Sequence, residues 1–225
     1  MATFVLIPGA GGQAEYWDEL VAELERRRHT PIAVDIREDD PALGLPEYAA
    51  IVDAAIGARA GVVLVAQSLG GFTAPMVRAS YDRLVLLNAM IPLPGETPGE
   101  WWGATGAPEA RRAADEAAGR DPEFDVERHF LHDVPQDVKA RMLAGEVREP
   151  SDTPFGQPCA FRCWPEVPIH VVAGRDDRFF PADLQRRVAR QRLGLDVDEI
   201  PGGHLVAKSN PAGLADLLVG YLDRT

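Results

Sequence analysis

A single serine separates a buried-strand pattern from a helix pattern in the segment GVVLVAQSLGGFTAPMV, which spans residues 61–77. The small residues Ala66 and Gly70 lie two positions before and two positions after Ser68. On a sharp turn from a strand into a helix the backbone of a serine is strained, and larger side chains at these two positions would collide. The segment therefore predicts a nucleophile elbow, G-x-S-x-G with alanine in the first glycine position, and Ser68 as a nucleophile.

A nucleophilic serine requires a base that takes its proton and a third group that orients the base. The chain order typical of this turn is serine, then an acid, then histidine. Asp177 in VVAGRDDRFFP and His204 in DEIPGGHLV follow in that order, each just after the expected end of a strand. We predict His204 as the base and Asp177 as the acid, with the neighbouring Asp176 as the rival acid.

The other histidines occupy positions that favour different roles. His170 lies inside a strand pattern and His29 at the end of a helix pattern, while RHFLHDVP contributes His129 and His132. A histidine in such a position is more often packed or solvated than catalytic.

Hydrolysis through a serine also requires hydrogen-bond donors for the oxygen that becomes negative in the tetrahedral intermediate. The N–H of Leu69, directly after the nucleophile, is one candidate. The glycine-rich loop IPGAGG after the first strand supplies the other, and we predict the N–H of Ala10 for this role. Gly9 in the same loop would let the backbone approach the substrate closely.

Several continuous apolar runs predict strands that are buried on both faces: TFVLIPG, PIAVDI, GVVLVAQ, RLVLLNA and PIHVVAG. Between the early runs, AEYWDELVAELERRRH and LPEYAAIVDAAIGARA place apolar residues at spacings of three and four, which is typical of amphipathic helices. Strands that alternate with helices predict an α/β fold whose mostly parallel sheet has helices on both faces.

The alternation stops between residues 91 and 166, where proline, glycine and charged residues become more frequent. PEARRAADEAAGR and PQDVKARMLAGEV in this region have helical character. We predict an α/β core of residues 1–90 and 167–225 and a helical cap insertion of residues 91–166, since long insertions at strand ends commonly cover a binding site. Large apolar residues near it are the predicted pocket walls: Met90, Ile91, Trp101, Trp102 and Phe179.

Composition narrows the functional classes. The chain has 225 residues and a net charge of −12, which argues against general affinity for nucleic acids or anionic membranes. The first residues have no basic segment ahead of an apolar one, so a cytoplasmic location is expected. Cys159 and Cys163 lack the further ligands of a zinc site, and we expect no metal and no cofactor.

The motifs FVLIPGAGG, AQSLGG, GRDDRFFP and GGH, in this order, resemble the α/β-hydrolase superfamily. Within it the chain is similar to the small branch of plant methylesterases, salicylate-binding esterases and hydroxynitrile lyases, which also holds many bacterial esterase-like hydrolases. The resemblance covers nearly the whole chain and extends to FLHDVP in the insertion, which looks like the helical cap of that branch. It implies an α/β-hydrolase fold of about six strands with Ser68, His204 and Asp177 as triad and the Ala10 and Leu69 amides as oxyanion hole.

The sequence departs from the family pattern at several positions. Pro8 stands where many members have histidine, Gln67 precedes the nucleophile where histidine is frequent, and Ala66 replaces glycine. The hydroxynitrile lyases have a lysine after the catalytic histidine and a threonine in the oxyanion loop, whereas this chain has Leu205 and Gly9. These last two differences favour ester hydrolysis over cyanohydrin cleavage.

The resulting hypothesis is a serine hydrolase of a small, largely apolar carboxylic ester or lactone. Two alternatives stay open: a lyase, cyclase or decarboxylase on the same scaffold, and a ligand-binding protein with a vestigial triad. A dehalogenase or epoxide hydrolase with an aspartate nucleophile is disfavoured, because the elbow carries Ser68. A small molecule is the expected partner, and the sequence leaves open whether the chain forms a homodimer.

Overall fold

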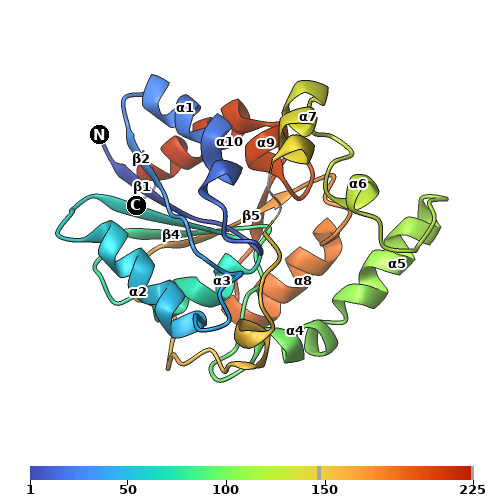
Figure 1. Ribbon diagram of the computed structural model, residues 1–225, viewed down its shortest axis with the longest axis horizontal. Helices are drawn as coiled ribbons and strands as arrows, with labels where there is room; N and C mark the ends of the chain where they lie inside the picture. Colours follow the sequence, from blue (N-terminus) through green and yellow to red (C-terminus); the bar gives the residue numbers. More distant parts are fainter. Residues whose placement is uncertain (146–147, 224–225) are drawn as a thin grey trace.

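A computed structural model describes residues 1–145 and 148–223 (Figure 1). In this part of the chain six strands form one sheet in the order β2-β1-β3-β4-β5-β6, and every neighbouring pair is parallel. The predicted α/β fold with a parallel sheet is confirmed. The strands are β1 (Thr3–Ile7), β2 (Thr30–Ala33), β3 (Val62–Gln67), β4 (Arg83–Leu87), β5 (Ile169–Gly174) and β6 (Val197–Ile200).

The helices connect successive strands, fill the segment between β4 and β5 and follow the last strand. The α-helices are α1 (Asp18–Arg26), α2 (Leu45–Ile56), α3 (Gly70–Thr73), α4 (Pro98–Thr105), α5 (Ala107–Ala117), α6 (Val126–His129), α7 (Gln136–Ala144), α8 (Ala182–Leu193), α9 (Val206–Ser209) and α10 (Pro211–Gly220). Short 3₁₀ helices are η1 (Ala14–Trp17), η2 (Ala74–Met76), η3 (Thr153–Gly156) and η4 (Tyr221–Asp223).

Helices cover both faces of the sheet, with α1, α9 and α10 on one face and α2, α3 and α8 on the other (Figure 1). Each central strand therefore contributes to two apolar clusters. In β1, Val5 and Ile7 belong to the cluster under α2 and α8, and Phe4 and Leu6 belong to the cluster under α1 and α10. This double burial explains why the central strands appear in the sequence as continuous apolar runs rather than alternating ones. The prediction is wrong for PIAVDI, because β2 lies at the edge of the sheet and its residues are exposed or only partly buried.

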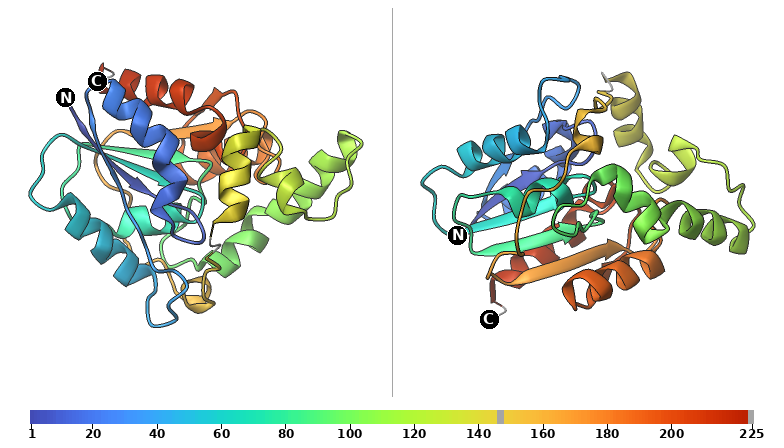
Figure 2. Two further views of the ribbon diagram at one scale, coloured as in Figure 1. Left: turned by 45° about the horizontal axis from the view of Figure 1, so that its top comes forward. Right: turned by 90° about the horizontal axis from the view of Figure 1, so that it is seen from below.

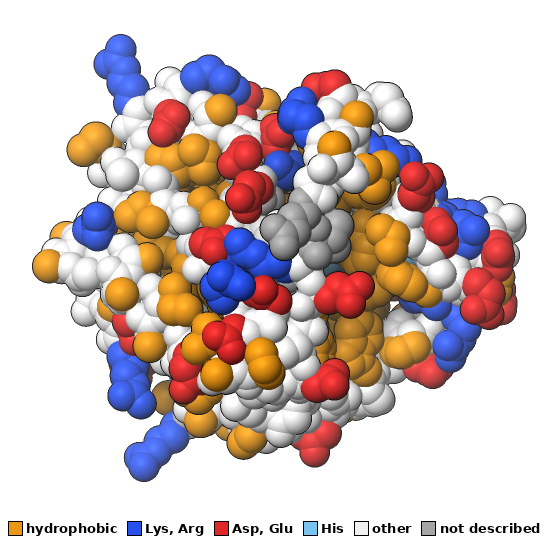
Figure 3. Space-filling model, in the orientation of Figure 1, with side chains coloured by type: hydrophobic (Ala, Val, Ile, Leu, Met, Phe, Trp, Pro, Cys, Tyr) orange, Lys and Arg blue, Asp and Glu red, His pale blue; other side chains and the backbone are white. Residues whose placement is uncertain are grey.

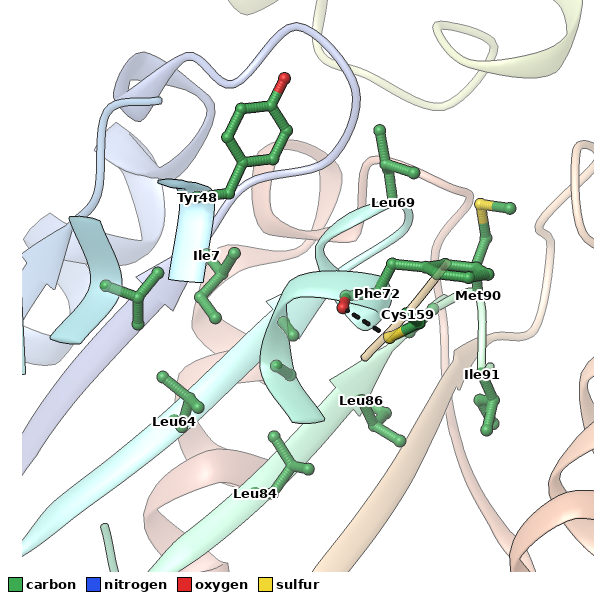
Figure 4. Close-up of a cluster of buried hydrophobic side chains, with 14 of the residues drawn as sticks. Ile7, Tyr48, Leu64, Leu69, Phe72, Leu84, Leu86, Met90, Ile91 and Cys159 are labelled. Carbon is green, nitrogen blue, oxygen red and sulfur yellow. Dashed lines mark hydrogen bonds between the residues drawn. The ribbon is translucent and has the colours of Figure 1, made fainter. Parts of the chain in front are cut away.

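A chain segment from the insertion completes the larger cluster. Cys159 is buried beside Phe72 of α3, and its Sγ donates a hydrogen bond of 3.1 Å to the Phe72 carbonyl (Figure 4). Burial raises the pKa of the Cys159 thiol to about 12. The thiol therefore stays protonated and acts as a small packing group.

The segment between β4 and β5 holds α4 to α7 and η3, and it extends to one side of the sheet (Figure 2). Trp101 of α4 packs in the larger sheet cluster, whereas Leu131, Val134 and Val138 form a small cluster of their own. The division at residues 91–166 stays a prediction, and residues 146–147 of this segment and 224–225 of the core lie outside the described residues. Among the described helices none is long and apolar enough to span a membrane.

A substitution at Gly71 tests how closely α3 packs on the segment after β4. A Cβ at Gly71 would lie 2.0 Å from the Met90 carbonyl oxygen, so we expect Gly71→Ala to lower the free energy of unfolding by about 1–3 kcal/mol or more. Gly103, exposed in α4 with open space at its Cβ position, provides the matched control. Gly103→Ala should be neutral or stabilise by up to about 1 kcal/mol. Urea unfolding followed by circular dichroism measures both, and an unchanged Gly71→Ala variant would contradict this packing.

Candidate active site

The turn after β3 holds Ser68 in a left-handed backbone conformation with a φ of 49°. The Ser68 carbonyl accepts hydrogen bonds from the N–H groups of Met90 (2.9 Å) and Gly71 (3.1 Å), which fix the turn. A Cβ at Gly70 would lie 2.6 Å from the Pro8 carbonyl oxygen. The position two after the serine is thus restricted to glycine, as the sequence pattern predicts.

Three distant segments place Ser68, His204 and Asp177 in one hydrogen-bonded row. His204 Nε2 lies 3.1 Å from Ser68 Oγ, and His204 Nδ1 lies 2.8 Å from Asp177 Oδ2. Ser68 is 8% exposed, Asp177 is 5% exposed and His204 is 1% exposed, so the whole row is buried and the imidazole is the most shielded of the three groups. The arrangement is that of a nucleophile, a general base and an orienting carboxylate.

The carboxylate of Asp177 is held through both of its oxygens. Oδ1 accepts the N–H groups of Phe179 (2.8 Å) and Phe180 (2.9 Å), while Oδ2 accepts the side-chain amide of Gln185 (3.2 Å) besides His204. The rival Asp176 is exposed, and its Oδ2 accepts the N–H of Gly202 at 3.2 Å. The acid that faces the histidine is therefore Asp177.

Three phenylalanine rings surround the imidazole of His204. The ring centroids of Phe179 and Phe180 lie 5.1 Å from that of His204, and the centroid of Phe130 lies 5.2 Å away. Such edge-on contacts keep water from the imidazole and restrict its rotation. Phe130 was not among the sequence-predicted site residues, although it belongs to the FLHDVP motif that connects the insertion with the family pattern.

The predicted pocket walls divide into two groups. Met90, Ile91 and Trp101 are almost fully buried, and the indole N–H of Trp101 donates to the Ile91 carbonyl at 3.1 Å. Phe179 and Trp102 are half-buried, and their ring centroids are 5.6 Å apart. In the space-filling view, hydrophobic side chains gather where the helices α5 and α6 meet the body of the molecule (Figure 3).

A polar cleft lies beside Asp177. Its volume is about 520 Å³, and it does not reach Ser68 or His204. A ligand there would contact the acid side of the row rather than the nucleophile. Its lining contains equal numbers of arginines and aspartates: Arg120, Arg175, Arg178, Arg186, Asp133, Asp176, Asp177 and Asp183.

The loop after β1 approaches the nucleophile closely. A Cβ at Gly9 would lie 2.9 Å from Ser68 Cβ and 2.2 Å from Gln67 Oε1, so no larger residue fits there. In the described part of the chain the N–H groups of Ala10 and Leu69 donate to no protein acceptor. Both amides are thus available to a ligand oxygen, as an oxyanion hole requires.

The insertion contacts the backbone next to His204. The N–H of Gly203 donates to Asp133 Oδ2 at 2.5 Å, and Leu205 packs on the small cluster around Leu131. The segment FLHDVP therefore covers the histidine loop. The other histidines have different neighbours: His29 contacts Ala2, His129 contacts Asp115, His132 lies beside Asp133, and His170 stacks on Tyr221.

No group of three or more histidine, cysteine, aspartate or glutamate side chains among the described residues could hold a metal ion. Cys163 is exposed and Cys159 is buried, and both are free thiols.

Glu38 contacts the loop after β1, and sequence analysis did not predict it as a site residue. Its carboxyl group is only 2% exposed, and its Oε2 accepts the N–H of Gly11 at 2.8 Å. Burial raises the pKa of Glu38 to about 8, while the Gly11 hydrogen bond and the charge of Arg148 lower it. The next glycine, Gly12, would place a Cβ 2.0 Å from the Ile36 carbonyl oxygen, so the loop is tightly packed on this side.

Glu38 makes the stability of the fold depend on pH. Since its pKa is about 8 when folded and 4.5 ordinarily, the folded protein keeps a proton that the unfolded chain loses between these values. The contribution of Glu38 to stability therefore falls as pH rises from about 4.5 to about 8. We expect Glu38→Gln, which retains an acceptor for Gly11, to have a free energy of unfolding up to about a few kcal/mol higher than the wild type at pH 9, and therefore to unfold at a higher temperature.

The stability gain of Glu38→Gln over the wild type should shrink towards pH 5, where Glu38 is protonated in the folded protein. Glu116→Gln removes the same charge from an exposed position and should show no such pH-dependent gain. Thermal unfolding at pH 5, 7 and 9 measures the effect. A Glu38→Gln variant that is equally or less stable than the wild type at pH 9 would contradict the burial of this carboxyl group.

Comparisons with known proteins agree with this fold. Residues 4–217 match the model of the alpha/beta hydrolase family. Similar solved structures include an extracellular alpha/beta-hydrolase from a Paenibacillus species (20% identity, TM-score 0.76, 98% of both chains covered) and a pyrethroid hydrolase from Sphingobium faniae JZ-2 (21% identity, TM-score 0.76, 99% of this chain and 98% of that one). A methylesterase from Arabidopsis covers 100% of both chains at 15% identity and a TM-score of 0.76.

A comparison with curated proteins gives no match. The resemblance to the α/β-hydrolase superfamily that the motifs indicate is confirmed, because the family match spans nearly the whole chain. The similar structures share the fold over the same length. The chain belongs to the alpha/beta hydrolase family.

Proposed function

We propose that the protein is a serine hydrolase that cleaves a small, largely apolar carboxylic ester or lactone. The observation that carries the proposal is the row Ser68–His204–Asp177, with distances of 3.1 Å and 2.8 Å between its polar atoms. A serine in this setting can lose its proton as it attacks a carbonyl carbon. The half-buried ring of Phe179 beside His204, and the half-buried ring of Trp102 that contacts Phe179, favour an apolar substrate.

The proposed reaction proceeds in two stages through an acyl-enzyme. Ser68 Oγ attacks the carbonyl carbon while His204 Nε2 takes the hydroxyl proton, and the amides of Ala10 and Leu69 stabilise the negative oxygen. The intermediate expels the alcohol, which receives the proton from His204. Water then attacks the acyl group as His204 takes one of its protons, and the acid leaves as Ser68 regains its hydrogen.

Similar structures support an esterase over the alternatives. They include a pyrethroid hydrolase, a methylesterase and a polyneuridine aldehyde esterase, each at 21% identity or less. Their names describe ester-cleaving or hydrolytic proteins, and the same fold also carries other chemistry. The lyase and binding-protein hypotheses therefore serve as outcomes of the test.

Labelling by a fluorophosphonate tests the nucleophile without knowledge of the substrate. The reagent forms a Ser Oγ–P bond with loss of fluoride only when the serine is activated. We expect one label per chain at Ser68, located by peptide mass spectrometry, and a fall of at least about 10³-fold in its rate in His204→Ala. Ser68→Ala should take up no label there. Folded wild-type protein that is not labelled would contradict the proposed mechanism.

Cleavage of short p-nitrophenyl esters in water enriched in ¹⁸O tests the reaction class. A hydrolase incorporates one labelled oxygen into the acid product. Turnover without this incorporation would indicate lyase or cyclase chemistry, and tight binding of esters without turnover would indicate a binding protein.

The two adjacent aspartates provide a matched test of the acid. In Asp177→Asn the side chain no longer carries the charge that stabilises the imidazolium, and kcat for a p-nitrophenyl ester should fall by about 10⁴-fold. Asp176→Asn changes an exposed side chain that contacts Gly202 and should leave kcat within about threefold of the wild type. An equal loss in both variants would show that the acid is wrongly assigned.

A further inference from the structure

Asn88 makes a complete set of hydrogen bonds at the end of β4. The residue is fully buried and has a φ of 45°, a conformation that asparagine tolerates better than most residues. Its Oδ1 accepts the N–H of Gly174 at 2.7 Å, and its Nδ2 donates to the carbonyls of Gly203 (3.1 Å) and His204 (3.0 Å). One side chain thus connects the loop that carries the acid with the loop that carries the base.

Gln185 on α8 extends this connection to the carboxylate itself. Its Nε2 lies 3.2 Å from Asp177 Oδ2, the oxygen that accepts His204, and 3.3 Å from Asn88 Oδ1. The same Nε2 donates to the Phe180 carbonyl at 2.7 Å. Gln185 is 5% exposed, so water does not readily replace these contacts.

We propose that Asn88 and Gln185 are positioning residues that set the separation and orientation of His204 and Asp177. This role rests on the proposed function, because it acts on the reaction through the base and the acid. Neither side chain contacts Ser68 Oγ, so their effect is on geometry and not on bond making.

The amide at position 88 has a defined orientation. Gly174 presents an N–H and the histidine loop presents two carbonyls, so only oxygen towards Gly174 and nitrogen towards residues 203–204 satisfies all three backbone groups. A carboxylate at this position would keep the acceptor and lose both donors. Asn88→Asp therefore places an oxygen against the Gly203 and His204 carbonyls at almost unchanged volume, which should displace the histidine loop.

Gln185→Met is the second variant, since methionine has a similar length and lacks the donor. The matched control is Gln157→Met, which makes the same exchange at a glutamine whose Oε1 accepts the Leu45 N–H at the start of α2. This control removes the hydrogen bond to the Leu45 N–H and leaves the contacts of Asp177 and His204 unchanged. All three proteins are compared only after circular dichroism shows that they are folded at the assay temperature.

The rate of fluorophosphonate labelling separates positioning from stability. We expect the maximal labelling rate at Ser68 to fall by about 10²-fold in Asn88→Asp and by on the order of 10-fold in Gln185→Met, because small displacements of reacting groups have effects of this size. The reagent concentration for half-maximal rate should stay within about threefold of the wild type. Gln157→Met should keep the wild-type labelling rate even if it unfolds at a lower temperature.

Unchanged maximal labelling rates in folded Asn88→Asp and Gln185→Met would overturn the proposal. If Asn88→Asp does not fold, Gln185→Met and its control decide alone.

A second readout does not depend on catalysis. The proton between His204 Nδ1 and Asp177 gives a far-downfield ¹H NMR signal when it is shielded from water, and His204→Ala assigns it. We expect the signal to shift or broaden in Gln185→Met and Asn88→Asp and to stay unchanged in Gln157→Met. Should the wild type resist labelling, the proposed function fails, while a changed signal still supports the positioning role and an unchanged one overturns it.

Discussion

The backbone of Ser68 has a φ of 49°, and this conformation constrains the residues that pack against the turn. A left-handed conformation at a residue other than glycine costs on the order of 1–3 kcal/mol and persists only where the surroundings determine it. Here the carbonyl of Ser68 accepts two N–H groups, and Gly70 and Gly71 allow backbone oxygens of Pro8 and Met90 to approach within the space of a missing Cβ. The strained turn projects the hydroxyl group beyond the sheet, where the other loops can reach it.

The order of the strands explains how residues far apart in the sequence meet at this hydroxyl. Strands β3, β4, β5 and β6 are consecutive neighbours in the sheet, and their carboxyl ends lie on the same edge. Ser68 follows β3, Asn88 follows β4, Asp177 comes after β5 and His204 after β6. The polar row is therefore a product of parallel pairing, and any slip in the register of one strand would separate its members.

Local patterns were enough to predict the strands with continuous apolar runs, the elbow and the order of serine, acid and histidine. β6 was harder to recognise, because VDEI at the edge of the sheet is partly exposed and lacks such a run. Asn88, Gln185 and Glu38 carry no local signal at all. Asn88 and Glu38 act through partners 86 and 27 positions away in the sequence. Gln185 contacts Asp177, 8 positions away, and Asn88, 97 positions away. Only the folded chain shows which groups these buried side chains meet.

Gln67 shows how a departure from the family pattern fits into this network. Its Nε2 lies 3.4 Å from the His204 carbonyl, the same oxygen that Asn88 approaches, and its Oε1 occupies the space that a side chain at Gly9 would need. A residue next to the nucleophile thus contacts both the histidine loop and the oxyanion loop. Because a Cβ at position 9 would lie 2.2 Å from Gln67 Oε1, the observed orientation of the glutamine fits glycine at position 9 and would be crowded by any larger residue there.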